Sequence, residues 1–149
     1  MRTMINGVIL RKLQALDQVL LELHSLGRVT VTQLESDWRT CRAVERDLQV
    51  LVEIVMDICQ RLLSLQGQTP AATGSEAVQR CIDLGILSPD EAYRKMVQFR
   101  NFIVHRYEHI ELAILASMVN KYLADFEQFR EEILKYVRQS ELGSLATDA

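Results

Sequence analysis

The sequence predicts an all-α protein, an up-and-down bundle of four main helices with short extra helices between them. Through most of the 149 residues, apolar side chains recur at spacings of three and four, which is the period of an amphipathic helix. No stretch keeps the strict alternation of a strand, and no hairpin turn is present. Six glycines and two prolines are few for a protein rich in loops or strands.

The first half of the chain contains three expected helices. Residues 5–26 carry one apolar stripe, and Gly27 should end this helix because glycine adopts a left-handed conformation without steric penalty. The stretch Thr32-Gln33-Leu34-Glu35 has the form of a capping box and predicts the start of a short helix. Residues 38–65 then place apolar side chains on one side and charged ones on the other, as in a bundle helix.

The second half begins with the longest expected loop, residues 66–74, which contains two glycines and a proline. A short helix should follow from Ser75 and end at Gly85. The motif Ser88-Pro89-Asp90-Glu91 predicts the next start, because serine caps a helix, proline suits its first position and the glutamate completes a capping box. This helix should run from Pro89 to about Tyr107.

The last expected helix is one segment over residues 110–142. Residues 143–149 have little to bury and are expected to form a frayed tail. The apolar fraction of 48% is enough to bury a core, and one domain is usual at this length. We therefore predict a single helical domain over residues 1–142.

Composition and charge argue against several classes of protein. No apolar run approaches the roughly 18–20 residues of a membrane span, and the charged N-terminal segment is not that of a signal peptide. The net charge of −3 argues against a globally basic nucleic-acid coat protein. Three widely spaced cysteines argue against a disulfide framework or a CxxC zinc site, so we expect a reducing, cytoplasmic compartment. We expect all three to be buried or half-buried small residues and not catalytic thiols: Cys41, Cys59 and Cys81.

One segment stands out by its charge. Residues 92–107 contain four basic residues and no acidic one, although the protein as a whole is acidic. A local positive field is what a phosphodiester substrate requires, but a solvated helix face would carry the same charge, so the charge alone leaves both interpretations open. The four basic residues are Arg94, Lys95, Arg100 and Arg106.

The chemically useful groups of this segment are Arg100, Asn101, His105 and Tyr107. Successive helical residues turn by about 100°, so Asn101 and His105 share a face, whereas Arg100 and His105 point about 140° apart. They can act together if the helix bends, if the arginine wraps round it, or if two copies meet across a two-fold axis. The dimer is the economical solution, because two-fold dimers are the commonest oligomers.

Other kinds of site have weak support. His105 and His109 have the spacing of helical metal ligands, but HExxH is absent and the one remaining histidine is His24, an expected surface residue. The sequence contains no glycine-rich phosphate loop, no GxSxG and no paired-carboxylate signature. We therefore expect neither a metal nor a cofactor.

The stretch from Arg100 to Tyr107 resembles the R-x4-H-x-Y motif of the HepT-like toxins, a family of the all-helical HEPN superfamily. Similarity to that family covers about residues 1–140 in the order and length of the elements. After the tyrosine the sequence departs from the family, with an acid and a second histidine in Glu108-His109. Further stretches that are similar to the family are Arg42-Ala43-Val44-Glu45-Arg46, Gly85-Ile86-Leu87 and Phe99-Arg100-Asn101.

The resemblance implies a ribonuclease toxin of a two-gene toxin–antitoxin pair, a homodimer that cleaves RNA without a metal in a cleft between protomers. Arg100 and His105 would be its catalytic pair, with Asn101 beside the arginine. Tyr107 would be the residue onto which a minimal nucleotidyltransferase antitoxin transfers adenylyl groups from ATP. The other basic residues of the segment, expected to bind the RNA substrate, are Arg94, Lys95 and Arg106.

The alternative interpretation is a non-catalytic helical module that uses the same basic cleft to hold a nucleotide or a partner protein. The net acidity of the chain favours it mildly. A purely structural dimer is a third possibility, but a scaffold needs none of the spacings of the arginine, asparagine, histidine and tyrosine.

Overall fold

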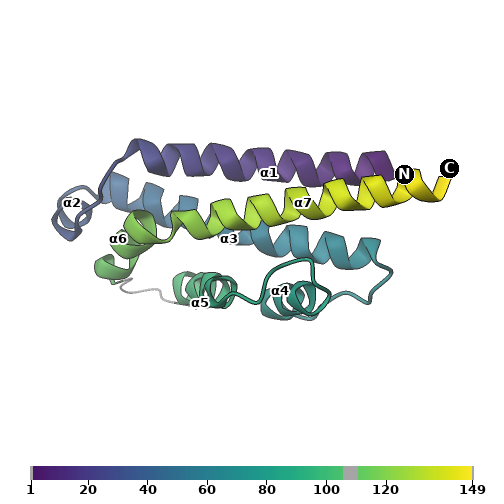
Figure 1. The fold of residues 1–149 in the computed structure, drawn as a ribbon. Helices are drawn as coiled ribbons and strands as arrows, with labels where there is room; N and C mark the ends of the chain where they lie inside the picture. Colours follow the sequence, from purple (N-terminus) through teal and green to yellow (C-terminus); the bar gives the residue numbers. More distant parts are fainter. Residues whose placement is uncertain (1, 106–110, 149) are drawn as a thin grey trace.

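The computed structural model describes residues 2–105 and 111–148, and it confirms the all-α fold. Three long helices, α1, α3 and α7, run alongside one another, whereas α4 and α5 lie across them on one side (Figure 1). Within the described residues, no helix combines the length and the apolar character needed to cross a membrane. The helices of this part of the chain are α1 (Arg2–Ser25), α2 (Val31–Ser36), α3 (Trp38–Leu65), α4 (Gly74–Asp83), α5 (Glu91–His105), α6 (Leu112–Lys121) and α7 (Leu123–Asp148).

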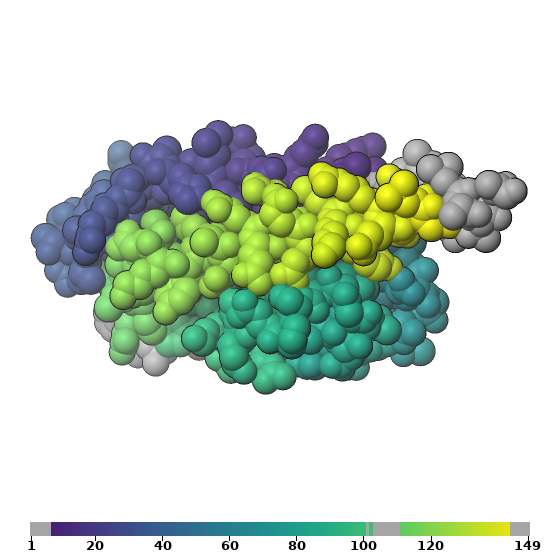
Figure 2. Space-filling view, viewed as in Figure 1, coloured from purple at the N-terminus to yellow at the C-terminus, as the bar shows by residue number. Residues whose placement is uncertain are grey.

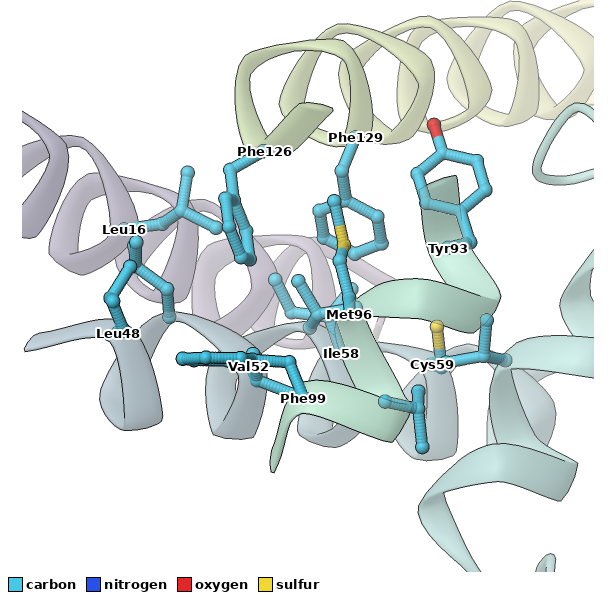
Figure 3. Packing of buried hydrophobic residues seen from close by; sticks show 14 of the residues in the cluster. Leu16, Leu48, Val52, Ile58, Cys59, Tyr93, Met96, Phe99, Phe126 and Phe129 are labelled. Carbon is cyan, nitrogen blue, oxygen red and sulfur yellow. The ribbon is translucent and has the colours of Figure 1, made fainter. Parts of the chain in front are cut away.

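The core is built around α3, which packs against α1, α2, α4, α5 and α6. Its buried side is almost wholly aliphatic, and Phe126 and Phe129 of α7 reach toward it from the opposite side of the core (Figure 3). Among the described side chains, none that is fully buried is charged. On the face shown in Figure 2, the surface of α7 separates α1 from the α4–α5 layer. Burial of the apolar side of α3 explains why the helical spacing of apolar residues in the sequence predicts the fold.

The long helix α3 has the predicted bounds, but the two short helices begin earlier than predicted. The Thr30 hydroxyl accepts a hydrogen bond from the Gln33 N–H at 3.1 Å, so Thr30, not Thr32, caps α2. At α4, the Thr73 hydroxyl accepts from the N–H of Glu76 at 3.0 Å. The capping threonine in each case precedes the residue at which the helix was expected to start.

The start of α5 is capped differently from the prediction. The helix begins at Glu91, and the carboxylate of Asp90, not the hydroxyl of Ser88, accepts a hydrogen bond from the Ala92 N–H, at 3.0 Å. Ser88 instead donates two hydrogen bonds to the carboxylate of Glu132 on α7, one from its N–H at 2.5 Å and one from its hydroxyl at 2.9 Å. A local sequence motif cannot predict a partner that lies 44 positions further along the chain. Ser88 therefore fixes the position of α5 against α7.

The expected last helix is divided in two. Helix α6 ends at Lys121, and Tyr122, at φ −114° and ψ 4°, turns the chain before α7 begins. The Asn120 side chain accepts a hydrogen bond from the Val29 N–H at 2.9 Å and donates one to the Val29 carbonyl at 2.7 Å. These two bonds connect the end of α6 to the segment before α2. This contact between distant segments overrides the local helical pattern.

The last helix also ends later than predicted, because the backbone of α7 continues to Asp148, beyond the expected end at residue 142. The expected fraying of residues 143–149 stays a prediction. Extending an existing helix adds one backbone hydrogen bond per residue, and a glycine inside a helix costs only about 1 kcal/mol. The lack of apolar residues to bury therefore did not predict where this helix ends.

Glu132 is the centre of a polar cluster that anchors α5. Its carboxylate also accepts hydrogen bonds from the Tyr93 hydroxyl at 2.7 Å and from the Gln128 amide at 3.0 Å. Burial acts to raise the pKa of Glu132, but the hydrogen bonds donated by Ser88, Tyr93 and Gln128 outweigh it and lower the pKa below its ordinary value. The folded state therefore favours the ionised carboxylate.

We expect Glu132→Gln to destabilise the fold by about 1–2 kcal/mol at pH 7, because four donor groups, two of them on Ser88, lose a charged acceptor. A carboxyl whose pKa is lowered on folding stabilises the protein above its unfolded pKa, and this contribution disappears as the pH falls through the lower, folded value. The difference between wild type and variant should therefore shrink below about pH 4.5. Urea unfolding at pH 7 and at pH 3.5 measures both quantities.

The matched control for this prediction is Glu131→Gln, at the next position of α7. Glu131 is exposed and contacts only the Arg130 guanidinium, at 3.2 Å, among the described groups. Exposed pairs of this kind contribute about 0–1 kcal/mol. A Glu132→Gln loss no larger than that of the control, or one that does not change with pH, would contradict the anchoring role.

Candidate functional site

Helix α5 positions the candidate residues, and it is held on three sides. It packs against α3 and α4, and its first turns are fixed to α7 by the Glu132 cluster. Tyr93 is fully buried, its ring meets Phe129 edge-on at 6.1 Å between centroids, and its hydroxyl points toward α7 (Figure 3). The backbone that carries the motif is therefore fixed by packing in its first turns.

The buried residues of α5 define which side of the helix faces the core. Tyr93, Met96, Val97 and Phe99 are all buried, and at about 100° per residue they cover one continuous side. Position 100 falls on this inner side. Positions 101 and 105 fall on the opposite, outer side, which the exposed residues Arg94 and Gln98 share.

Arg100 is half-buried, as its place on the inner side requires. Its Nε atom is inaccessible to solvent and has no hydrogen-bond partner among the described residues. A buried donor without an acceptor costs roughly 1–3 kcal/mol, so such an atom requires an explanation. An acceptor from outside the protomer, such as a phosphate oxygen or a group of a second copy, would satisfy it.

The other predicted residues of the motif can be placed only in part. The structure describes the backbone of Asn101 and His105 as the last turns of α5, but not their side chains. Arg106 and Tyr107 lie outside the described residues, as does His109. The prediction that Arg100 and His105 point in different directions therefore rests on the side chain of Arg100 and on the backbone positions of 101 and 105.

The two predicted substrate-binding residues at the start of α5 are exposed. Arg94 is already engaged, because its Nε donates to the Gln79 side chain of α4 at 3.2 Å and its Nη1 pairs with Glu91 at 3.5 Å. Lys95 forms no ion pair within the described part of the chain. Arg94 is thus a less available phosphate ligand than its charge predicts, since a carboxylate lies beside it.

Beside Arg94, a groove of about 560 Å³ separates α4 from α5. Gln79 and Asp83 of α4 form one wall, and Arg94 and Gln98 of α5 form the other. Sequence reasoning did not find this site. The i, i+4 spacing of each pair puts it on one helix face, but nothing in the sequence shows that these two faces oppose each other.

His24 and the three cysteines lie outside this site, and the predictions for these four residues agree with the structure. His24 is exposed and lies 2.9 Å from Glu127. Cys59 and Cys81 are fully buried, with the Cys81 thiol 3.6 Å from the Cys59 carbonyl, and Cys41 is half-buried. Among the side chains that the structure describes, no group of three histidine, cysteine or acidic residues is arranged to hold a metal ion.

Comparison with known proteins gives one family and several structures. The family model described as "Ribonuclease HepT-like" matches residues 11–133. The tri-AMPylated HEPN toxin of Shewanella oneidensis, in complex with an MNT antitoxin, is 22% identical, with a TM-score of 0.77 over 86% of this chain and 97% of that chain. A toxin–antitoxin structure with AMP-PNP is 21% identical, with a TM-score of 0.78 over 87% of this chain and 98% of that one.

A third similar structure is that of a mutant toxin–antitoxin pair named MntA–HpeT. It is 23% identical, with a TM-score of 0.75 over 87% of this chain and 98% of that chain. A comparison with curated proteins gives no match. At these identities the likeness to solved structures shows that the fold is shared.

Proposed function

Because the chain belongs to the HepT-like ribonuclease family, we propose that it is a ribonuclease toxin of a two-gene toxin–antitoxin system. One observation carries the proposal. The family match covers residues 11–133, and the R-x4-H-x-Y stretch, with Arg100, His105 and Tyr107, lies inside that span. The placement of Arg100 adds support, because its buried Nε lacks an acceptor within the described protomer.

We assign catalysis to Arg100 and His105. RNA carries its own nucleophile: the 2′-oxygen attacks the adjacent phosphorus, and the bond from phosphorus to the 5′-oxygen breaks. One histidine takes the proton of the 2′-hydroxyl and a second gives a proton to the leaving 5′-oxygen, which suits a side chain with an ordinary pKa of about 6.5. Arg100 holds the phosphate and offsets the charge that develops on it, and Asn101 is the polar neighbour.

We propose that the complete site forms in a homodimer. Within one straight helix, positions 100 and 105 point about 140° apart, with 100 on the inner and 105 on the outer side of α5. Two copies of residues 92–107 that meet across a two-fold axis would supply both histidines and bring an arginine to each phosphate. Lys95 and Arg106 would add positive charge along the RNA strand.

We further propose that the partner is a minimal nucleotidyltransferase antitoxin that adenylylates Tyr107. The similar structures described above are toxin–antitoxin complexes, one of them of an AMPylated toxin with an MNT antitoxin. An adenylyl group would add bulk and negative charge at the cleft. It would therefore exclude an RNA phosphate both by occupying the site and by repulsion.

The experiment that tests the ribonuclease function is cleavage of single-stranded RNA by the purified wild-type protein in EDTA at neutral pH. We expect cleavage that leaves a 2′,3′-cyclic phosphate, and light scattering should give about twice 17.1 kDa for the active species. The DNA oligonucleotide of the same sequence, which lacks the 2′-hydroxyl, should stay intact. Cleavage that stops in EDTA and returns with Mg²⁺ would contradict the mechanism, and RNA binding without cleavage would indicate the non-catalytic binding module instead.

A further inference from the structure

We propose that the groove between α4 and α5 is a nucleobase pocket, which selects a base of single-stranded RNA next to the cut site. The inference rests on the proposed ribonuclease function. It goes beyond that function because it assigns sequence preference to four residues outside the motif. These residues are Gln79, Asp83, Arg94 and Gln98.

The first observation is the position of the groove. Arg94 and Gln98 line it, and they lie on the outer side of α5, which positions 101 and 105 share. From position 98 to position 105 the helix rises by about 10 Å. A strand whose phosphate is at His105 can therefore place an adjoining base beside Gln98.

The second observation is that the polar groups of the groove are held in place before any ligand binds. The Gln79 side chain accepts from Arg94 at 3.2 Å and donates to Asp83 Oδ1 at 2.9 Å, so the amide can point only one way. Arg94 is also held by Glu91 at 3.5 Å. Preorganised groups of this kind lose little conformational freedom when they bind, which favours selective recognition.

The third observation is the charge of the groove, which favours a base over a phosphate. Arg80 contacts Glu76 at 3.7 Å and the Thr69 carbonyl at 2.8 Å, and Arg94 has its own partners. The two arginines are balanced by the carboxylates of Glu76 and Asp83 in the same lining. A phosphate would find no surplus positive charge here, whereas a neutral base needs none.

The chemistry of the lining suits the edges and faces of bases. Val78 and Val97, both almost fully buried, are the apolar residues of the lining, and the plane of an arginine can stack on a base. The Asp83 carboxylate can accept from an exocyclic amino group, as carboxylates do from cytosine. A volume of about 560 Å³ is within the range of small-molecule sites. Uracil has no exocyclic amino group, so the pocket should select adenine, cytosine or guanine against uracil.

The test is sequencing of the ends that the dimeric protein produces from a randomised single-stranded RNA. Wild type should show uracil depleted at one fixed position relative to the cut. Asp83→Asn and Gln98→Ala should each weaken this depletion at least about fivefold, the loss expected for one good base contact, by slowing cleavage at sites with adenine, cytosine or guanine more than at sites with uracil. The control Glu35→Gln, an exposed carboxylate on α2, should keep the wild-type preference.

The outcomes separate this proposal from the function on which it rests. If wild type cleaves RNA and both variants keep its preference, or if they lose rate equally at every sequence, the nucleobase pocket is wrong and the ribonuclease function stands. If wild type cleaves no RNA, the function fails and the pocket is tested by binding alone, with fluorescent oligo-C and oligo-U. Equal affinity for the two, or a difference that survives in Asp83→Asn, would then overturn the pocket.

Discussion

His105→Ala should lower the rate of RNA cleavage by about 10²–10⁴-fold and leave the fold intact. The expected loss is that of a general acid or base, which His105 is proposed to supply to both the attacking and the leaving oxygen. Position 105 is at the end of α5, and by the helical period it does not continue the buried stripe of the first turns, so the variant should fold, which circular dichroism checks. Cleavage of a fluorescent RNA and growth of cells that express the protein are the two measurements.

The matched control is His24→Ala. His24 is an exposed histidine on α1 whose ring contacts Glu127, and it should have wild-type activity. Arg100→Ala should lose as much activity as His105→Ala, whereas Arg138→Ala, an exposed arginine on α7, should lose none. A His105→Ala protein that cleaves within tenfold of wild type would contradict the assigned mechanism.

The His105→Ala variant also tests whether the site is shared between protomers. Wild type and an equal amount of His105→Ala protein, unfolded together and refolded as a mixture, should keep about a quarter of the activity, because only wild-type homodimers then contain both histidines. A heterodimer has one histidine and should be inactive. Activity near one half, although mass spectrometry shows that heterodimers form, would place all groups of each site in one protomer.

The fold was predictable where burial alone decides it. The apolar period of α3 predicts this helix, because one continuous stripe is buried from Val44 to Leu63, whereas its first turn is capped by the Asp37 carboxylate. Two of the errors, at the start of α5 and at the break between α6 and α7, fall where side chains bond to distant segments. Ser88 contacts Glu132 of α7, and Asn120 contacts Val29, and no local motif contains either partner.

The sequence likewise predicts one part of the candidate site and not the other. Spacing on one helix predicts that Arg100 and His105 diverge, and the buried side of α5 shows that Arg100 is the inner of the two. The groove lined by Gln79 and Gln98 was not predictable, because it depends on two helices that pack side by side. Glutamines on the polar face of an amphipathic helix usually contact only water, so their types alone indicate nothing.

Tyr107→Phe should leave the protein toxic in the presence of its nucleotidyltransferase partner, which should neutralise the wild type. In the proposed reaction the phenol oxygen of Tyr107 attacks the α-phosphorus of ATP, the proton leaves the phenol, and pyrophosphate departs. The wild-type protein should therefore gain mass in whole adenylyl units when it is incubated with the partner and ATP. Intact-mass spectrometry and growth of cells that express both proteins measure the two effects.

Two other tyrosines provide the controls, because the structure gives them different environments. Tyr93 is fully buried, and burial, together with its hydrogen bond to Glu132, raises the pKa of its phenol well above the usual range, so it should never be modified. Tyr122 is 38% exposed, and Tyr122→Phe should be adenylylated and neutralised like the wild type. Full neutralisation of Tyr107→Phe without any gain of mass would mean that the antitoxin acts by binding alone. In that case the negative charge of the adenylyl group would have no part in blocking the cleft.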